Sequence, residues 1–230
     1  MAFELNATLL PDSEASPADE IYGFMTALDS YTDLLGPFHP QTLAMANMLA
    51  VAFWRAGEVD QAMALLDQVL DRLRSSRAPE DPTRVDMLST LAKILFEQRH
   101  LERASIIQRE VLEWRVRHSG VNDPASLEAK GDLAVILFEL GQYGEAAALE
   151  EETFDTARIH LGKTNPISCV LAWNRALRQE RGGDPDSARR IIVSELVWLL
   201  AEDPSCLDTD QNTVRSMLAE RLNWDIARTC

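Results

Sequence analysis

The 230-residue chain is poor in cysteine, in basic residues and in long apolar runs, and each shortage excludes a class of protein. Its three cysteines, Cys169, Cys206 and Cys230, are far apart and form no CxxC pair, which argues against a disulfide framework or a zinc knuckle. No segment approaches the roughly 18 consecutive apolar residues of a membrane span, and the first residues lack the basic and apolar regions of a signal peptide. We therefore expect a cytoplasmic protein.

Basic residues are outnumbered by acidic ones. The 22 Lys and Arg against 37 Asp and Glu give a formal net charge of −15 and a pI of about 4.6. Such a surface repels phosphate backbones and anionic lipids, so we expect neither nucleic acid nor a membrane as a partner. Hydrophobic residues (46%) and charged residues (26%) are present in the proportions of a folded globular protein.

An internal repeat determines the architecture. Pro40, Pro82, Pro124 and Pro166 are separated by 42 residues each time. Alanines recur at the same interval in two further columns, Ala62, Ala104, Ala146, Ala188 and Ala50, Ala92, Ala134, Ala176. Fixed-period similarity over many columns is the signature of a repeat protein, and here it defines four units.

Each unit has the pattern of a helix hairpin. Capping residues precede the proline that opens the first helix, and apolar residues then recur at helical spacing. The capping residues are His39, Asp81, Asp123 and Asn165. Gly57, Gly141 and Gly183 mark a break before a second apolar helix, while the second unit has Arg99 in this column. No segment alternates with a period of two, so we expect no sheet.

The register extends beyond the four units. Ser16 and Pro17 open a predicted helix near residues 17–35, and Asp208 opens a closing helix. We therefore predict an all-α fold with about ten helices in one solenoid. Its expected segments are an irregular 1–15, a half-repeat at 16–36, repeats at 37–78, 79–120, 121–162 and 163–204, and a capping helix and tail at 205–230.

The repeats resemble the tetratricopeptide family. Leu49-Ala50-x-x-Phe53 followed by Gly57 and Ala62 matches that pattern, and the 42-residue period with the junction at residues 35–42 is similar to the kinesin light chain type. The resemblance covers residues 36–204. It implies a right-handed superhelix of helix hairpins whose first helices line a concave groove, and a non-catalytic scaffold that holds a segment of another protein.

The resemblance also implies which residues line the groove. They are Asn47, Val51, Trp54, Arg55, Ser89, Lys93, Phe96, Val135, Phe138, Trp173, Leu177 and Arg181. Apolar anchors among the acidic columns Asp86, Glu97, Glu128, Glu139 and Glu180 favour an apolar, net-basic peptide. A ring at helical spacing also fits packing against the next repeat, so both interpretations stay open. We expect Trp173 to be the most exposed of these aromatic residues.

Signatures of chemistry are missing. We find no phosphate-binding glycine loop, no nucleophile elbow and no convincing set of metal ligands, because His118 and His160, one period apart, have no third ligand nearby in the pattern. We therefore expect no enzyme activity, cofactor or metal. The alternative function is a regulatory or assembly subunit that acts through its convex or terminal surfaces, including self-association.

Two charged features have simple interpretations. Arg175, Gln179 and Glu180 occupy columns that are apolar in earlier units, which indicates either a drifting terminal repeat or a specialised polar end of the binding surface. The run Glu150-Glu151-Glu152 is interpreted as a solvated convex face.

Overall fold

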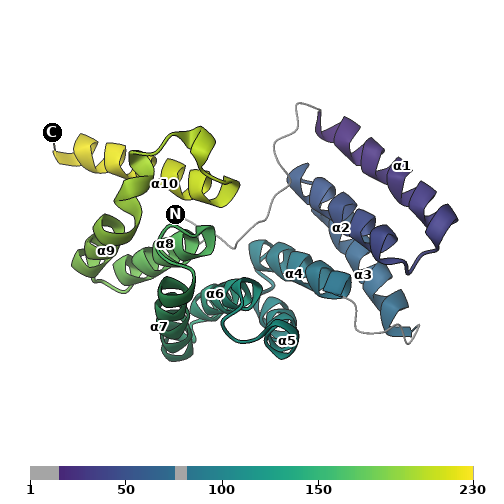
Figure 1. Cartoon of the computed structure of the whole chain (residues 1–230), viewed down its shortest axis with the longest axis horizontal. Coiled ribbons are helices and arrows are strands. Elements are labelled where there is room, and N and C mark those ends of the chain that lie inside the picture. The colour runs from purple at the N-terminus through teal and green to yellow at the C-terminus, as the bar shows by residue number, and fades with distance from the viewer. Residues whose placement is uncertain (1–15, 76–81, 230) are drawn as a thin grey trace. The chain divides into compact units, whose positions relative to one another are not determined.

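The computed structural model describes residues 16–75 and 82–229, and the regular structure in these residues is entirely helical (Figure 1). This confirms the expected all-α fold with ten α-helices in the described part of the chain. The helices are α1 (Pro17–Leu35), α2 (Pro40–Arg55), α3 (Val59–Ser75), α4 (Pro82–Glu97), α5 (Leu101–Ser119), α6 (Pro124–Glu139), α7 (Tyr143–His160), α8 (Pro166–Arg181), α9 (Pro185–Ile191) and α10 (Thr209–Thr229). The expectations for residues 1–15, for Asp81 as a cap and for Cys230 lie outside the described residues.

The helices form two compact units. One contains α1 to α4 and the part of α5 up to Trp114, and the other runs from Arg115 through α10. In the first unit α2 packs against α1, α3 and α4. In the second unit α6 packs against α7 and α8, and α8 also packs against α7, α9 and α10. None of the helices that the structure describes is both long and apolar enough to cross a bilayer.

The predicted caps open the first helices. His39 Nδ1 accepts a hydrogen bond from the Gln41 amide at 3.3 Å, and the Asp123 and Asn165 side chains accept one from the second residue of their helices at 3.0 Å. Ser16 caps α1 by accepting from the Asp19 amide at 3.2 Å. Each proline then occupies the first helical position, where its missing N–H costs nothing.

The break between the two helices of a repeat has the same backbone conformation in all four repeats. Gly57, Gly141 and Gly183 have φ of +82°, +79° and +88°, and Arg99 adopts φ of +61° in the same column. The following amide donates back to a carbonyl five residues earlier, as in the hydrogen bond from Gln142 to Leu137 at 2.9 Å. These bonds close each first helix with a Schellman motif, which requires a left-handed residue.

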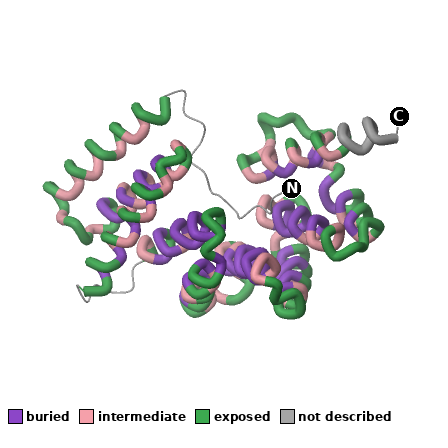
Figure 2. The backbone as a smooth tube through the Cα atoms, turned by 180° about the vertical axis from the view of Figure 1, so that it is seen from behind, coloured by how far each residue is buried: buried purple, intermediate pink, exposed green. Residues whose placement is uncertain are grey.

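Small residues allow the two helices of a repeat to approach closely. The alanines of the predicted column are at most 1% exposed, which confirms their predicted burial. They are Ala62 and Ala104 in the first compact unit and Ala146 and Ala188 in the second. Figure 2 shows buried positions in α2 to α9, and they are densest in α4, α6 and α8, where runs of consecutive residues are buried. A larger side chain in this column would separate the helix axes.

The second helix of the fourth repeat departs from the pattern. Asp184 and Pro185 open α9 as predicted, but α9 ends at Ile191 and continues as a π-helical turn, Ile192–Leu196, and a 3-10 turn, Val197–Leu200. The closing helix α10 buries Val214 and Leu218, and its Gln211 donates to the Thr164 carbonyl at 2.7 Å.

Candidate protein-interaction surface

In the first unit, the predicted groove residues of α2 are accessible. Asn47, Val51 and Trp54 are half-buried, and they follow one face of the helix at spacings of four and three residues. On α4, Ser89 is half-buried, whereas Lys93 and Phe96 are buried. The structure therefore places an apolar and polar strip along α2, with α4 packed beside it.

Trp54 is held across this strip by a hydrogen bond. Its indole Nε1 donates to Glu97 Oε2 at 2.6 Å, which joins the end of α2 to the end of α4. The bond fixes the orientation of a large ring that remains partly open to solvent. A rigid aromatic side chain of this kind provides contact area at a small entropic cost. The predicted groove residue Arg55 lies next to it and forms an ion pair with Glu20 of α1 at 3.7 Å.

In the second unit, most predicted groove residues are part of the core. Val135, Trp173 and Leu177 are 5%, 1% and 2% exposed. The expectation that Trp173 is the most exposed aromatic residue is therefore wrong. The physical reason is that α8 is packed on several sides, by α6, α7, α9 and α10. A Cβ atom added at Gly131 of α6 would lie 2.5 Å from Leu171 Cδ2 of α8, which shows how closely these two first helices approach.

Two other residues of the predicted set remain at the surface of the second unit. Phe138 is half-buried, and Arg181 donates to Glu139 at 2.6 Å. The sequence interpretation missed Tyr143, which is 62% exposed and packs edge-on against Phe138 with ring centroids 5.1 Å apart. The signal was an aromatic residue two positions after the turn glycine Gly141.

The acidic columns of the predicted rim are engaged within the chain. Besides Glu97 and Glu139, Glu180 accepts two hydrogen bonds from Arg221 of α10, at 2.7 and 2.9 Å. Asp86 and Glu128 also make interactions of their own. The rim is therefore less negative than a count of carboxylates suggests, because Arg181 and Arg221 each bring a compensating charge.

The polar residues of the fourth repeat build an ion-pair network with α7. Arg178 Nε donates to Glu150 Oε2 at 2.8 Å, and Arg175 lies 4.8 Å from the centre of the Phe154 ring and 4.0 Å from Glu150. Glu150 is 6% exposed, so the interpretation of Glu150 as part of a solvated convex face is wrong, while Glu151 and Glu152 are exposed. Burial raises the pKa of the Glu150 carboxyl above its ordinary value, although Arg178 and Arg175 oppose the shift.

Other reactive groups give no catalytic arrangement. Burial, with smaller effects from Asp208 and Glu195, raises the pKa of the Cys169 thiol to about 12, so this cysteine is a poor nucleophile at neutral pH. Among the described residues, no group of three or more His, Cys, Asp and Glu side chains is arranged to hold a metal ion.

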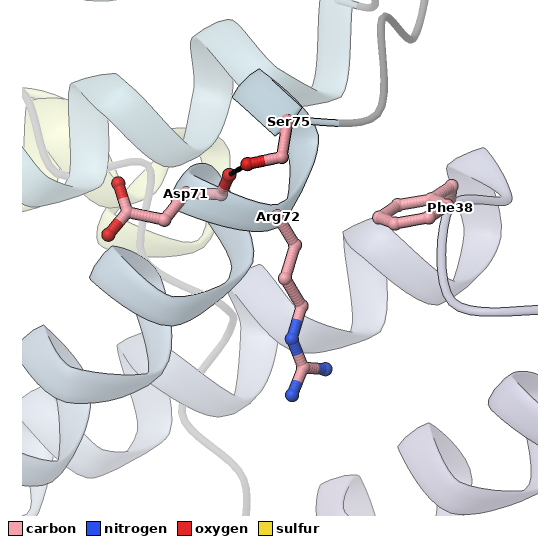
Figure 3. A pocket seen from close by; sticks show the side chains of 4 residues that line it. All are labelled: Phe38, Asp71, Arg72 and Ser75. Carbon is pink, nitrogen blue, oxygen red and sulfur yellow. Dashed lines mark hydrogen bonds between the residues drawn. The ribbon is translucent and has the colours of Figure 1, made fainter.

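An open, shallow pocket lies in the first unit at the end of α3. Phe38, Asp71, Arg72 and Ser75 line it (Figure 3). The Ser75 hydroxyl donates to the Asp71 carbonyl at 2.9 Å, and the Asp71 carboxylate bonds with Arg74, so these polar groups are partnered locally. The Arg72 side chain and the Phe38 ring are the parts of the pocket that lie open in this view.

Comparison with known proteins decides the family. The tetratricopeptide repeat model matches three consecutive segments, residues 42–82, 84–125 and 126–167. The chain belongs to the tetratricopeptide repeat family. The three segments cover more than half of the sequence and have the period deduced from the prolines. Comparison with curated proteins found no match.

Solved structures of the kinesin light chain type share this fold. BtubC (BKLC) from P. vanneervenii has a TM-score of 0.71 at 14% identity, over 94% of this chain and 93% of that one. Kinesin light chain-like, nearly identical TPR-like repeats of Podosopora anserina give 0.66 at 21% identity, over 77% and 84% of the two chains. A second structure of these repeats gives 0.64 at 21% identity, over 76% and 83%. The repeat family and the kinesin light chain-like type predicted from the sequence are confirmed.

Tetratricopeptide repeats serve in general as scaffolds for protein interactions, and they are typically non-catalytic. A protein partner is therefore the general expectation for this chain.

Proposed function

We propose that this chain is a non-catalytic scaffold that holds a short segment of another protein on the face formed by α2 and α4. The observation that carries the proposal is Trp54, whose half-buried ring is fixed between the two helices by its bond to Glu97. Interfaces obtain much of their binding energy from a few such rigid aromatic side chains in partly desolvated positions. Val51, one helical turn before Trp54, extends the apolar contact.

Polar groups beside Trp54 suit the backbone of an extended peptide. The Asn47 amide offers both a donor and an acceptor, and the Ser89 hydroxyl offers either role. The Asn47 Oδ1 atom has no hydrogen-bond partner among the described residues. A bound peptide N–H would satisfy this atom after a rotation of the side chain, which makes Asn47 a specific contribution to affinity.

The ligand that suits this face is apolar and net basic. Glu97 uses one oxygen for Trp54, and a carboxylate with one donor retains capacity for a Lys or Arg of the ligand. The net charge of −15 also attracts a basic segment over longer distances. In the second unit, Phe138 and Arg181 are the predicted ligand-binding residues that remain at the surface.

Peptide selection followed by substitution tests this function. Peptides are selected from a displayed random library on the immobilised chain, and the dissociation constant of the best one is measured with Trp54→Ala and with Asn47→Ala. We expect a loss of at least tenfold for Trp54→Ala and of about threefold to tenfold for Asn47→Ala, with thermal unfolding used to confirm that both variants fold.

The matched control is Ile106→Ala, which removes an exposed apolar side chain from α5 of the same unit. We expect its affinity for the selected peptide to stay within twofold of the original chain. Binding that is unchanged in folded Trp54→Ala and Asn47→Ala variants contradicts the proposal.

A further inference from the structure

The first helix, α1, has an unusual surface for a helix of this fold. None of its residues is buried, whereas every other helix of the first unit has buried positions (Figure 2). Glu20 and Phe24 are half-buried, yet the columns they belong to are buried in all four later repeats, at Ala62, Ala104, Ala146 and Ala188 and at Leu66, Gln108, Glu150 and Ile192. The helix therefore retains core-type side chains with only part of their usual cover.

An apolar flank runs along α1 beside this partly covered face. Ile21, Tyr22, Met25 and Leu28 recur at spacings of three and four residues, so they follow one side of the helix, which we call the α1 flank. Tyr22 and Met25 are 73% and 47% exposed. Exposed large apolar side chains that cluster on one helix mark an interaction surface more often than isolated ones do.

Charged residues replace the apolar side chain of Met25 in three of the four full repeats. The column of Met25 holds Asp67, Arg109 and Glu151 in the second helices of the first three repeats and the exposed Val193 in the fourth. These charged residues keep the outer surface of the repeats soluble. At α1 the same position is apolar, and the Met25 side chain is 47% exposed.

The charges around the α1 flank have one sign. The helix carries Asp19, Glu20, Asp29 and Asp33 and no Lys or Arg. The second helices α3, α5 and α7 each have basic residues in their last turn, where they compensate the partial negative charge of the helix end. Helix α1 has none there and adds Asp33 instead, so no basic residue of its own last turn compensates the helix dipole.

We propose that the α1 flank binds an amphipathic helix of a partner protein, one that carries Leu or aromatic residues along one stripe and Lys or Arg beside it. The apolar stripe of the partner would cover Ile21, Met25 and Leu28. Its basic residues would lie near Asp29 and Asp33, where they compensate both the carboxylates and the helix dipole. This surface is separate from the α2 and α4 face and develops the alternative of a function through terminal surfaces.

A second copy of this chain suits the surface poorly. Pairing α1 with another α1 would bring Asp29 and Asp33 near the same acidic residues of the partner, and like charges in a partly desolvated contact disfavour association. The net charge of −15 on each chain adds to the repulsion. Charge complementarity therefore selects a basic partner.

A designed peptide provides the test. A labelled 16-residue peptide of Leu and Lys with the Leu residues at helical spacing is compared with a scrambled peptide of the same composition, using fluorescence anisotropy on the full chain. We expect at least tenfold tighter binding of the amphipathic peptide, because a scrambled sequence retains the charge and loses the stripe. Hydrogen–deuterium exchange should then slow in residues 17–35 when the peptide is bound.

Substitutions separate this surface from general attraction to an acidic protein. The double variant Tyr22→Ser, Met25→Ser should lower the affinity for the amphipathic peptide at least tenfold. Asp29→Lys should lower this affinity about threefold or more at low salt. Glu202→Lys, an exposed acidic position of the second unit, changes the net charge equally and should have less than a twofold effect. Trp54→Ala should leave this binding unchanged, which distinguishes it from the proposed peptide-binding face.

Three results overturn the proposal. The first is equal binding of the two peptides, or binding unaffected by the folded Tyr22→Ser, Met25→Ser variant. The second is a dimer of the chain alone, seen by sedimentation and dissociated by the same variant, because a second copy would then be the occupant. The third is exchange in residues 17–35 of the free chain as slow as in α2, since α1 would then be covered by the chain itself.

Discussion

Arg178 of α8 binds Glu150 of α7 through a hydrogen bond from Nε to Oε2 and an ion-pair contact from Nη2 to Oε1, both 2.8 Å long. The contact joins the third repeat to the fourth. Glu150 occupies a column that holds Leu66 in the first repeat, so an apolar contact has been replaced by a buried ion pair. Arg175 and Arg178 of the fourth repeat are thus matched to partners in the third repeat, whereas Glu180 pairs with Arg221 of α10.

Removing one member of this pair should destabilise the second unit. We expect Arg178→Met to lower the free energy of unfolding by about 3 kcal/mol, because it leaves a buried carboxylate with weaker compensation. The double variant Glu150→Met with Arg178→Met should lose clearly less than the sum of the two single variants. Chemical denaturation of the four proteins measures the coupling, and additive losses would contradict an energetic link between the two side chains.

The buried thiol of Cys169 should be protected from alkylation. With a pKa of about 12, it is ionised to about one part in ten thousand at pH 8, whereas an ordinary thiol is substantially ionised at this pH. The pKa is raised, so the thiolate forms only as the pH rises towards 12. In a Cys206→Ser, Cys230→Ser background, iodoacetamide should label the native chain at least a hundredfold more slowly than the unfolded chain. Equal labelling rates would show that Cys169 is accessible.

The turn glycines should be needed for their backbone conformation and not for space. A Cβ atom at Gly141 meets nothing within 4 Å, but its φ of +79° is unfavourable for a residue with a side chain. We expect Gly141→Ala to cost about 1 kcal/mol. Gly144→Ala, three residues later in α7 with equal space, is the matched control and should be neutral or stabilising. Unfolding midpoints of the two variants measure the difference, and equal midpoints for Gly141→Ala and Gly144→Ala would contradict a need for glycine in the turn.

The alanine column should not tolerate a larger side chain. Ala146 is 1% exposed in α7, at the contact with α6. Replacing it with Leu should overpack this contact and lower stability by roughly 1 to 3 kcal/mol. Thermal unfolding measures the effect, with the exposed Ala148→Leu in the same helix as the control. An unchanged melting temperature of the Ala146→Leu variant would mean that the helices are less closely packed than described.

The fold was largely predictable from the sequence because its rules are local and repeated. Proline caps, turn glycines and apolar spacing recur four times, so an ambiguity in one repeat is resolved by the others. Arg99 is an instructive exception, since it adopts the left-handed turn that glycine occupies elsewhere. The register required this conformation even though the residue type did not suggest it.

The candidate surface was less predictable because exposure depends on the neighbours of a helix. Trp54 and Trp173 both belong to first-helix columns, yet Trp54 stays half-exposed and Trp173 is buried where α8 packs against α10 and its other neighbours. Nor does the sequence reveal that Glu97, Glu139 and Glu180 pair with side chains of other helices. Such pairings depend on side-chain geometry, which the aligned repeat sequences do not give.

Hydrogen–deuterium exchange with a library-selected peptide shows which helices the peptide covers. We expect slower exchange in residues 40–55 and 82–97, the two helices joined by Trp54 and Glu97, and loss of this protection in Trp54→Ala. Protection confined to α3, or to α10, with residues 40–55 and 82–97 unchanged, would contradict the assignment of α2 and α4 as the peptide-binding face.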